Sequence, residues 1–369
     1  MAGNSSLNAA AKAKKDEFYT QLPDIEQDLR HYRRHFKGKT VFCNCDDPFE
    51  SNFFKYFVLN FNKLGLKMVV ATCYRGSPIA GQQLSMFDEV TETEQPVNKP
   101  YKAVVTKVYD ATGDGGISML DVAELFRNGE NKLTLLEGDG DFRSPECLAL
   151  LDEADIVCTN PPFSLFREYV ATLVEHGKQF LIIGNVNALK YKEIFPLVMA
   201  NQLWLGASIH SGDRAFYVPD DYPLEAAGCG IDEMTGRKYI RVKGVRWFTN
   251  LDLKHRHEEM ILVKRYNPDD YPAFDNYAAI NVSKTAEIPC DYPGIMGVPL
   301  TFFDKYNPDQ FTVIWEASGN TRASAPKEVL EALGYTPSKE DRGGCCILNG
   351  KRCYDRIFIR NLHPEEPKQ

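Results

Sequence analysis

Residues 155–164, DIVCTNPPFS, combine an amide, two prolines and an aromatic ring directly after a short apolar run. Asn160 offers a side-chain oxygen and nitrogen to a ligand, and Phe163 offers a flat apolar face. Pro161 and Pro162 lack the N–H groups that a central strand needs, so the chain must leave the sheet here. The stretch predicts a rigid loop that presents polar and aromatic groups at the end of a buried strand.

Two acidic loops follow other apolar runs in the same way. CDDPF, residues 45–49, follows an early run, and GDGDF, residues 138–142, follows a later one. In open α/β sheets, ligands bind beyond the carboxyl ends of the strands. The three loops are therefore expected to converge on one binding site.

The ligand of these loops is not expected to be held through a phosphate. Neither G-x-G-x-x-G nor a P-loop with its lysine is present, and TGDGG at residues 112–116 is predicted to be a turn. Acidic loops suit a ligand with ribose hydroxyls, amines or a cationic centre. S-adenosylmethionine has all three.

Apolar runs and helical patterns alternate along the first half of the chain, and the runs are continuously apolar. This pattern predicts an open, mostly parallel α/β sheet of the Rossmann-like class. A hairpin around residues 101–116 is expected as an addition to the main sheet. Strands are predicted at 41–45, 67–74, 133–137, 155–160 and 179–185, and helices at 51–65, 119–129, 146–154 and 166–177.

Composition narrows the class of protein. No apolar run reaches the roughly 18 residues that span a membrane, and the polar N-terminus lacks the centre of a signal peptide. The ten cysteines include no C-x-x-C pair, so we expect reduced thiols in a cytoplasmic protein and no metal site. The net charge of −8 argues against nucleic acid, but residues 30–39 and 237–246 are locally basic, and phosphate contacts need only local charge.

Several segments, taken in order, resemble the EcoRI-type adenine-specific DNA methyltransferases. The resemblance runs from about residue 12 to residue 360. It is carried by KDEFYTQ at 15–21, VFCNCDDPFESNF at 41–53, GDGDF at 138–142, TNPPF at 159–163, VRWFTNLD at 245–252 and GVPLTFFDKYNPDQF at 297–311.

The resemblance implies which residues hold S-adenosylmethionine. They are Tyr19, Thr20, Asp46, Asp47, Asp141 and Phe142. Asp139 is an alternative to Asp141, and Asp46 and Asp47 could instead cap the next helix. The first loop lacks the usual G-x-G, and the second strand ends in TCY without a carboxylate. Which acid binds the cofactor ribose is therefore left open.

The resemblance also implies the catalytic groups. Asn160 would supply its side-chain oxygen and Pro161 its carbonyl to the amino group of the target adenine. Pro162 would stiffen the loop, and Phe163 would stack on the base. The base must be flipped out of the duplex to reach such a site.

Recognition of double-stranded DNA is expected from several regions. Arg241 and Lys243 are candidates for phosphate contacts. Trp247 and Phe248 alternate along a strand, so one of them, with Phe248 favoured, is expected to face the target base. The methyltransferase domain is predicted at residues 1–265, with excursions at 76–100 and 207–238, and a DNA-recognition region at 266–369.

A monomer is expected in a bacterial or phage system, with a companion restriction endonuclease that forms no stable complex with it. Two other functions use the same loop chemistry. One is methylation of a glutamine side chain in a protein. The other is DNA binding by a methylase homologue that has lost turnover.

Overall fold

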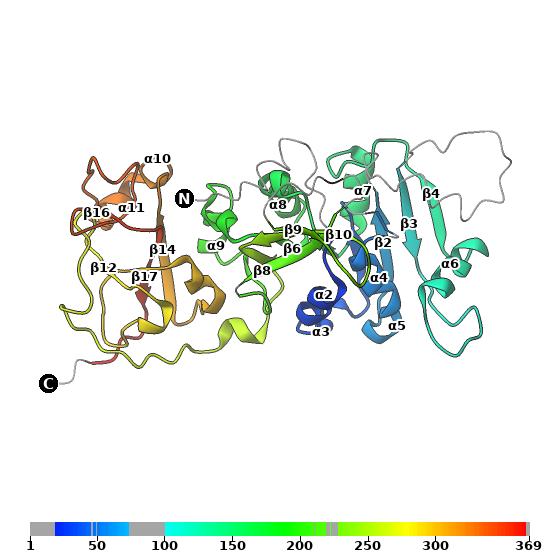
Figure 1. Ribbon diagram of the computed structural model, residues 1–369, viewed down its shortest axis with the longest axis horizontal. Helices are drawn as coiled ribbons and strands as arrows, with labels where there is room; N and C mark the ends of the chain where they lie inside the picture. Colours follow the sequence, from blue (N-terminus) through cyan, green and yellow to red (C-terminus); the bar gives the residue numbers. More distant parts are fainter. Residues whose placement is uncertain are drawn as a thin grey trace. The chain divides into compact units, whose positions relative to one another are not determined.

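The computed structural model describes residues 19–45, 47–48, 50–73, 100–210, 212–218, 222 and 228–366 (Figure 1). The chain divides into two compact units. Unit 1 comprises residues 1–188 and 206–251, and unit 2 comprises residues 189–205 and 252–369. Unit 2 includes His257, which hydrogen-bonds Asp309, and Arg256, which hydrogen-bonds Asn201.

Unit 1 is built around a mixed sheet whose strands run in the order β4-β3-β2-β1-β5-β6-β11. The pairs β1/β2, β1/β5 and β5/β6 are parallel, which agrees with the predicted α/β sheet with parallel strands. Strand β11 is antiparallel to β6. The bounds are β1 Thr40–Cys43, β2 Met68–Thr72, β3 Tyr101–Val105, β4 Lys132–Leu135, β5 Ile156–Thr159, β6 Gln179–Asn185 and β11 Val245–Thr249.

The prediction of an added hairpin around residues 101–116 is wrong. β3 lies inside the sheet, antiparallel to β2 on one side and to β4 on the other. Two successive reversals restore β4 to the direction of β1, so the loop after β4 reaches the same edge as the loops after β1 and β5. The excursion predicted at 76–100 lies, except for Pro100, outside the described residues.

Helices follow the strands of unit 1 where the helical pattern predicts them. The expected helix at 51–65 divides at Asn60, and it ends at Gly65, whose φ of 62° suits a left-handed cap. Phe54 and Phe57 of this helix are fully buried. The helices are α2 Leu22–Leu29, α3 Arg33–Phe36, α4 Asn52–Leu59, α5 Phe61–Leu64, α6 Met119–Arg127, α7 Pro145–Glu153, η2 Phe163–Leu165 and α8 Phe166–Glu175.

The excursion predicted at 207–238 contributes to a separate three-stranded antiparallel sheet in unit 1. Its order is β8-β10-β9, with β8 at Asp213–Tyr217, β9 at Cys229–Ile231 and β10 at Lys238–Lys243. Ile240 and Val242 of β10 are buried, whereas Arg241 and Lys243 are exposed on the opposite face. The alternation gives this sheet one covered and one solvated face.

Unit 2 contains a four-stranded sheet in the order β12-β13-β17-β14 and a short hairpin of β15 and β16. Asn349 and Gly350 form the hairpin turn with φ of 51° and 71°, as the Asn-Gly pair predicts. The elements are η3 Val186–Lys190, where the chain passes between units, α9 Phe195–Met199, β7 Trp204–Leu205, η4 Lys254–His257, β12 Ile280–Asn281, η5 Thr285–Glu287, β13 Met296–Val298, η6 Leu300–Lys305, β14 Phe311–Ala317, α10 Thr321–Ser324, α11 Lys327–Ala332, β15 Ile347–Leu348, β16 Lys351–Arg352 and β17 Arg356–Asn361.

Two expectations from composition can be compared with this fold. All ten cysteines are free thiols, as predicted. Among the described residues, no helix combines the length and the apolar character that crossing a membrane requires.

Candidate active site

The loop after β5 carries the Asn-Pro-Pro-Phe sequence, and its first residues are buried. Asn160 is 5% exposed, and Pro161 is also buried. The Pro162 carbonyl accepts the Leu165 N–H at 3.0 Å, which starts η2 and leads the chain into α8. Among the described residues, no backbone N–H donates to the Pro161 carbonyl.

The loop after β1 is tied to the same place through Asn44. Its backbone carbonyl accepts the hydroxyl of Thr159, the last residue of β5. Its side-chain oxygen accepts the hydroxyl of Tyr169, a buried residue of α8. Cys45 follows with a φ of 79°, the left-handed conformation that favours glycine, so the chain turns sharply here even without the usual G-x-G.

The loop after β4 completes the convergence. Phe142 is buried against the Tyr169 ring, with centroids 5.0 Å apart and an edge-to-face angle of 71°. Gly140 has a φ of 76°, and a Cβ atom there would lie 2.1 Å from the Cys73 carbonyl at the end of β2. This close approach fixes the loop against the sheet edge. The three loops therefore meet around Tyr169, as the sequence predicts for the strand ends.

The carboxylate of Asp141 is held in place by an ion pair with an arginine. Arg143 pairs with it at 2.6 Å and also contacts Glu168 at 3.3 Å. The hydrogen bonds from Arg143 keep the pKa of Asp141 below its ordinary value, so the group is ionised at neutral pH. Asp139 is exposed, and its side chain accepts the Asp141 N–H at 3.0 Å. Asp141 thus lies next to the buried ring of Phe142, whereas Asp139 supports the loop from outside.

Tyr19 and Thr20 lie beside the first loop and are buried. Tyr19 pairs with Tyr217 of β8, and the Thr20 carbonyl accepts the side-chain amide of Asn52 at 2.7 Å. The Thr20 hydroxyl is buried and has no hydrogen-bond partner among the described residues. A buried hydroxyl is costly without a partner, so this one is suited to a ligand that brings one.

Asp47 also lies in the loop after β1, and it is 2% exposed. Both of its carboxylate oxygens accept the hydroxyl of Tyr101 in β3, at 3.0 Å. Burial, followed by this neighbouring carboxylate, raises the pKa of the Tyr101 phenol. The cap of α4 is Ser51 rather than Asp47. Asp46 lies outside the described residues.

Phe163 connects the loop after β5 to the small sheet. Its ring lies edge-to-face with Phe216 of β8, with centroids 6.3 Å apart. Phe163 itself is only partly buried. Because Phe216 lies on the covered face of the small sheet, opposite Ile240, the excursion at 207–238 is placed beside the catalytic candidates.

Trp247 and Phe248 are both placed in the core, and neither ring lies at the surface. They are 1% and 0% exposed. Trp247 packs on Phe53, and Phe248 packs on Phe166. The expectation that one of them faces a target base assumed a strand with one open face. All residues of β11 are buried, so alternation along it selects between two covered faces.

The basic segment at 237–246 is divided by the fold. Arg237 pairs with Glu50 at 3.2 Å, and Arg246 is buried and donates to backbone carbonyls. Arg241 and Lys243 remain exposed on the solvated face of β10. The run at 254–257 in unit 2 is largely paired, with Arg256 stacked 3.8 Å from the Trp204 ring centroid. Arg241 and Lys243 are therefore the exposed cations of the 237–246 segment, and the Arg241 guanidinium lies 5.6 Å from the Tyr239 ring centroid.

Sequence reasoning missed three residues that organise the site. They are Asn44, Tyr169 and Phe216. Tyr169 follows Phe166 at helical spacing, which marks it as a buried residue. Its hydroxyl, however, meets Asn44, 125 positions away in the sequence, and no local pattern contains such a pairing.

A mixed sheet with parallel central strands, and three polar and aromatic loops at one edge, is consistent with the fold of a methyltransferase. Over residues 6–362 the chain matches the sequence profile of the family described as adenine-specific methyltransferase EcoRI. The chain belongs to this family. It is an adenine-specific methyltransferase of the EcoRI type.

Curated relatives cover nearly the full length of the chain. It is 44% identical to the Type II methyltransferase M.EcoRI of Escherichia coli, over 98% of this chain and 97% of that protein. It is 36% identical to M.MpnI of Mycoplasma pneumoniae, over 96% and 97%, and 35% identical to M.MgeORF184P of Mycoplasma genitalium, over 96% and 98%. No solved structure matches the chain.

Proposed function

We propose that this protein transfers a methyl group to the exocyclic N6 atom of adenine at a specific site in double-stranded DNA. The observation that carries the proposal is the loop after β5. It holds a buried Asn160, the Pro161 carbonyl and a partly exposed Phe163 at the edge where the loops after β1 and β4 meet.

The chemistry of the amino group explains why these residue types suit the reaction. The lone pair of the adenine amine is delocalised into the ring, which makes the amine a poor nucleophile. The Asn160 side-chain oxygen and the Pro161 carbonyl would accept its two hydrogens and draw the lone pair onto nitrogen. Proline fixes its own backbone torsion, so these acceptors act as preorganised electrostatic groups and not as strong bases.

The residues around this loop fit S-adenosylmethionine. The cofactor would supply an electrophilic methyl group on a sulfonium. Asp141 and Phe142 would hold its adenine, and the buried Thr20 hydroxyl would gain the partner that it lacks among the described residues. Tyr19 and Asp47 line the same region, although Tyr101 already occupies the carboxylate of Asp47. Asp46 remains a prediction from the sequence.

Phe163 would stack on the target adenine after the base has left the duplex. Base flipping is required because the amine of a paired adenine cannot reach a loop at the edge of a sheet. The small sheet would support the flipped base from behind, since Phe216 lies edge-to-face with Phe163. We assign Trp247 and Phe248, which are both buried, to the core and not to base contact.

DNA binding is assigned to two regions. Arg241 and Lys243 on the solvated face of β10 would contact phosphates. In unit 2, the hairpin of β15 and β16 exposes Lys351 and Arg352, and Tyr354 beyond it is 87% exposed. We assign sequence readout to unit 2 on the basis of these side chains. We further propose that the enzyme acts as a monomer and protects the sites of a companion restriction endonuclease.

The direct test follows the label from isotopically labelled S-adenosylmethionine. Purified protein is incubated with unmethylated duplex DNA in one reaction and with a protein extract in the other. Label recovered as N6-methyladenine after nuclease digestion supports the proposal. Label recovered as methylated glutamine would replace it with protein methylation. DNA binding without label in either reaction would mean that turnover has been lost.

A further inference from the structure

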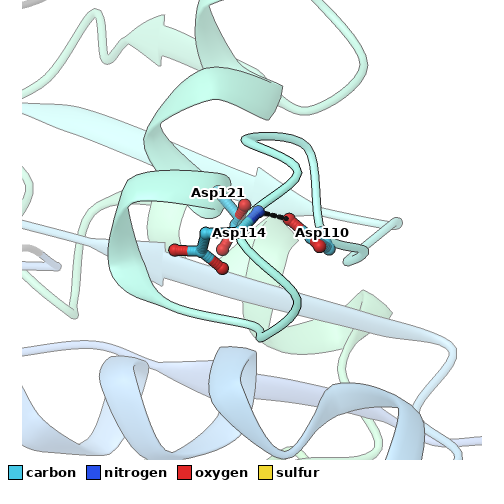
Figure 2. Close-up of side chains that lie close together, drawn as sticks. All are labelled: Asp110, Asp114 and Asp121. Carbon is cyan, nitrogen blue, oxygen red and sulfur yellow. Dashed lines mark hydrogen bonds between the residues drawn. The ribbon is translucent and has the colours of Figure 1, made fainter.

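The loop that joins β3 to α6 gathers three carboxylates at one point. One carboxylate oxygen from each of Asp110, Asp114 and Asp121 lies within 4.8 Å of the other two (Figure 2). Among the described residues, none of the three forms an ion pair with lysine or arginine. Like charges this close repel one another, and a cation would relieve the repulsion. The loop lies apart from the Asn160 site, and methyl transfer assigns it no role.

The sequence of this loop points to a cation independently of its coordinates. Residues 110–121 read DATGDGGISMLD, which has the length of a calcium-binding loop of the EF-hand type. Such loops place oxygen ligands at positions 1, 3, 5, 7, 9 and 12, and a glycine at position 6. Here these positions hold Asp110, Thr112, Asp114, the Gly116 carbonyl, Ser118 and Asp121, with Gly115 at position 6.

The order of residue types distinguishes this loop from a simple cluster of surface acids. Every side-chain ligand position carries an oxygen, and position 7, where the backbone carbonyl binds, is a glycine. Gly115, at position 6, has a φ of 93°, which accommodates the sharp turn needed there. The α6 helix begins at Met119, so Ser118 and Asp121 are its N-cap and third residue.

We propose that residues 110–121 bind one calcium ion. The loop departs from the usual pattern in having Thr112 at position 3 and the shorter Asp121, not glutamate, at position 12. A strand rather than a helix precedes it, and it has no partner loop among the described residues. Calcium affinity in such loops follows the number of charged ligands and the rigidity of the site. With three carboxylates, the site belongs among the weaker members of the class.

Hydrogen bonds within the loop show how it is held without an ion. Asp121 accepts the N–H groups of Ala111, Thr112 and Ser118, and Asp110 accepts the N–H of Gly115 at 2.8 Å. These donors keep the pKa of Asp121 well below its ordinary value, so it stays ionised. Asp121 also accepts the hydroxyls of Thr112 and Ser118, so its roughly four lone-pair sites are occupied and a cation would have to replace some of these donors. Asp114 accepts only the Gly116 N–H among the described residues and keeps acceptor capacity for a cation. If the loop binds no ion, hydrogen bonds from donors within the loop alone satisfy its carboxylates.

Calcium would stabilise the segment that leads into β4. This strand carries the loop of residues 138–142, so the ion would act on the edge of the sheet from a distance. A ligand that binds only the folded state raises the midpoint of thermal unfolding by mass action. The enzyme would still transfer methyl groups without the ion, because no ligand residue lies among the Asn160 loop or its neighbours.

The test titrates full-length protein, freed of metal with a chelator, with calcium chloride in a calorimeter. We expect one ion per chain and a Kd between about 10⁻⁵ and 10⁻³ M. Magnesium should bind more weakly, because it demands near-ideal octahedral geometry. Terbium gives a second readout, since Tyr109 directly precedes Asp110 and can sensitise its luminescence.

Two matched variants locate the site. Asp114→Asn removes one charge from an exposed ligand, yet its side-chain oxygen can still accept the Gly116 N–H, so the loop should fold. We expect at least about tenfold weaker calcium binding, together with loss of terbium luminescence. Glu124→Gln, on the adjacent helix and outside the loop, should leave both unchanged. Absence of saturable calcium binding by the parent protein, or binding that survives Asp114→Asn unaltered, would overturn the proposal.

Discussion

The loops at the carboxyl edge of the large sheet and the solvated face of β10 hold their side chains in different ways. At the edge, Asn160 is buried, and Tyr169 joins the loops after β1 and β4 through Asn44 and Phe142. On β10, Arg241 and Lys243 extend into solvent from alternate positions of a strand. Both regions belong to unit 1, and Phe216 on the covered face of the small sheet contacts Phe163 at the edge.

The difference corresponds to two physical tasks. Activation of a weak nucleophile requires acceptors that do not move as charge develops, and burial with rigid backbone provides this. Attraction of a phosphate backbone requires positive charge within reach, and long flexible side chains provide this without fixed geometry. Substitutions at the edge should therefore change the chemical step or the cofactor, whereas substitutions on β10 should change the dependence of DNA binding on salt.

The largest effect on folding is expected from Gly140→Ala. The new Cβ would lie 2.1 Å from the Cys73 carbonyl, in a backbone conformation with φ of 76° that alanine rarely adopts. We expect a loss of about 2–4 kcal/mol in the free energy of unfolding, measured with urea. Gly138→Ala is the matched control, because its Cβ would be 3.9 Å from the nearest atom, on Ser144. Equal losses in the two variants would show that the loop is not fixed at Gly140.

Phe163→Ala is expected to have a smaller effect in free energy than Gly140→Ala. It should lower both the rate of methyl transfer and the fraction of target bases that are flipped out. Stacking of one base on an aromatic side chain contributes about 1–3 kcal/mol, so transfer should slow by about 5- to 150-fold. Fluorescence of 2-aminopurine at the target position should fall, since fewer bases remain flipped. Phe163→Tyr retains the ring and should behave like the parent enzyme. Normal fluorescence with Phe163→Ala would remove the stacking role.

Asp141→Ala should weaken cofactor binding and leave the DNA contacts unchanged. Asp141 is partly buried, and loss of one polar partner there should cost about 1–3 kcal/mol, which calorimetry with S-adenosylmethionine can measure. Asp139→Ala is the matched control, because Asp139 is exposed and supports the loop through the Asp141 N–H. A larger loss from Asp139→Ala than from Asp141→Ala would transfer the cofactor role to Asp139.

The smallest effect is expected when Arg241 and Lys243 are both changed to alanine. Each phosphate contact contributes about 0.9 to the slope of log affinity against log salt, so the slope should fall by about 1.8. Specific and unrelated DNA should lose affinity alike, because phosphates carry no sequence. Arg127→Ala, at an exposed position on α6, serves as the control. An unaltered slope would show that the β10 face does not meet DNA.

Sequence periodicity located most strands and helices of the first unit, because continuous burial leaves a continuous apolar run. The strand predicted at 179–185 coincides with β6, and Gly65 ends the helix pair before β2. An apolar run does not show in which direction its strand runs in the sheet. An apolar strand reads the same in either orientation, so the insertion of β3 between β2 and β4 could not be predicted.

The candidate site shows the same limit. The residue types at the strand ends predicted where the loops would meet, because topology alone brings those ends to one edge. Side-chain partners depend on packing between distant segments, as for Tyr169 with Asn44 and for Phe248 with Phe166. The expectation for Phe248 did not anticipate that β11 is covered on both faces.

The most direct test of the role of the Asn160 loop is the single-turnover rate of methyl transfer by Asn160→Ala, at saturating cofactor and DNA. Loss of one preorganised polar group of this kind costs about 100- to 1000-fold in rate, and we expect a fall of that size. DNA and cofactor affinities should change by less than about tenfold, since the β10 face and the loop after β4 are intact. Asn160→Asp keeps an acceptor oxygen and should retain more activity than Asn160→Ala. Near-normal transfer by Asn160→Ala would contradict the catalytic role of the loop.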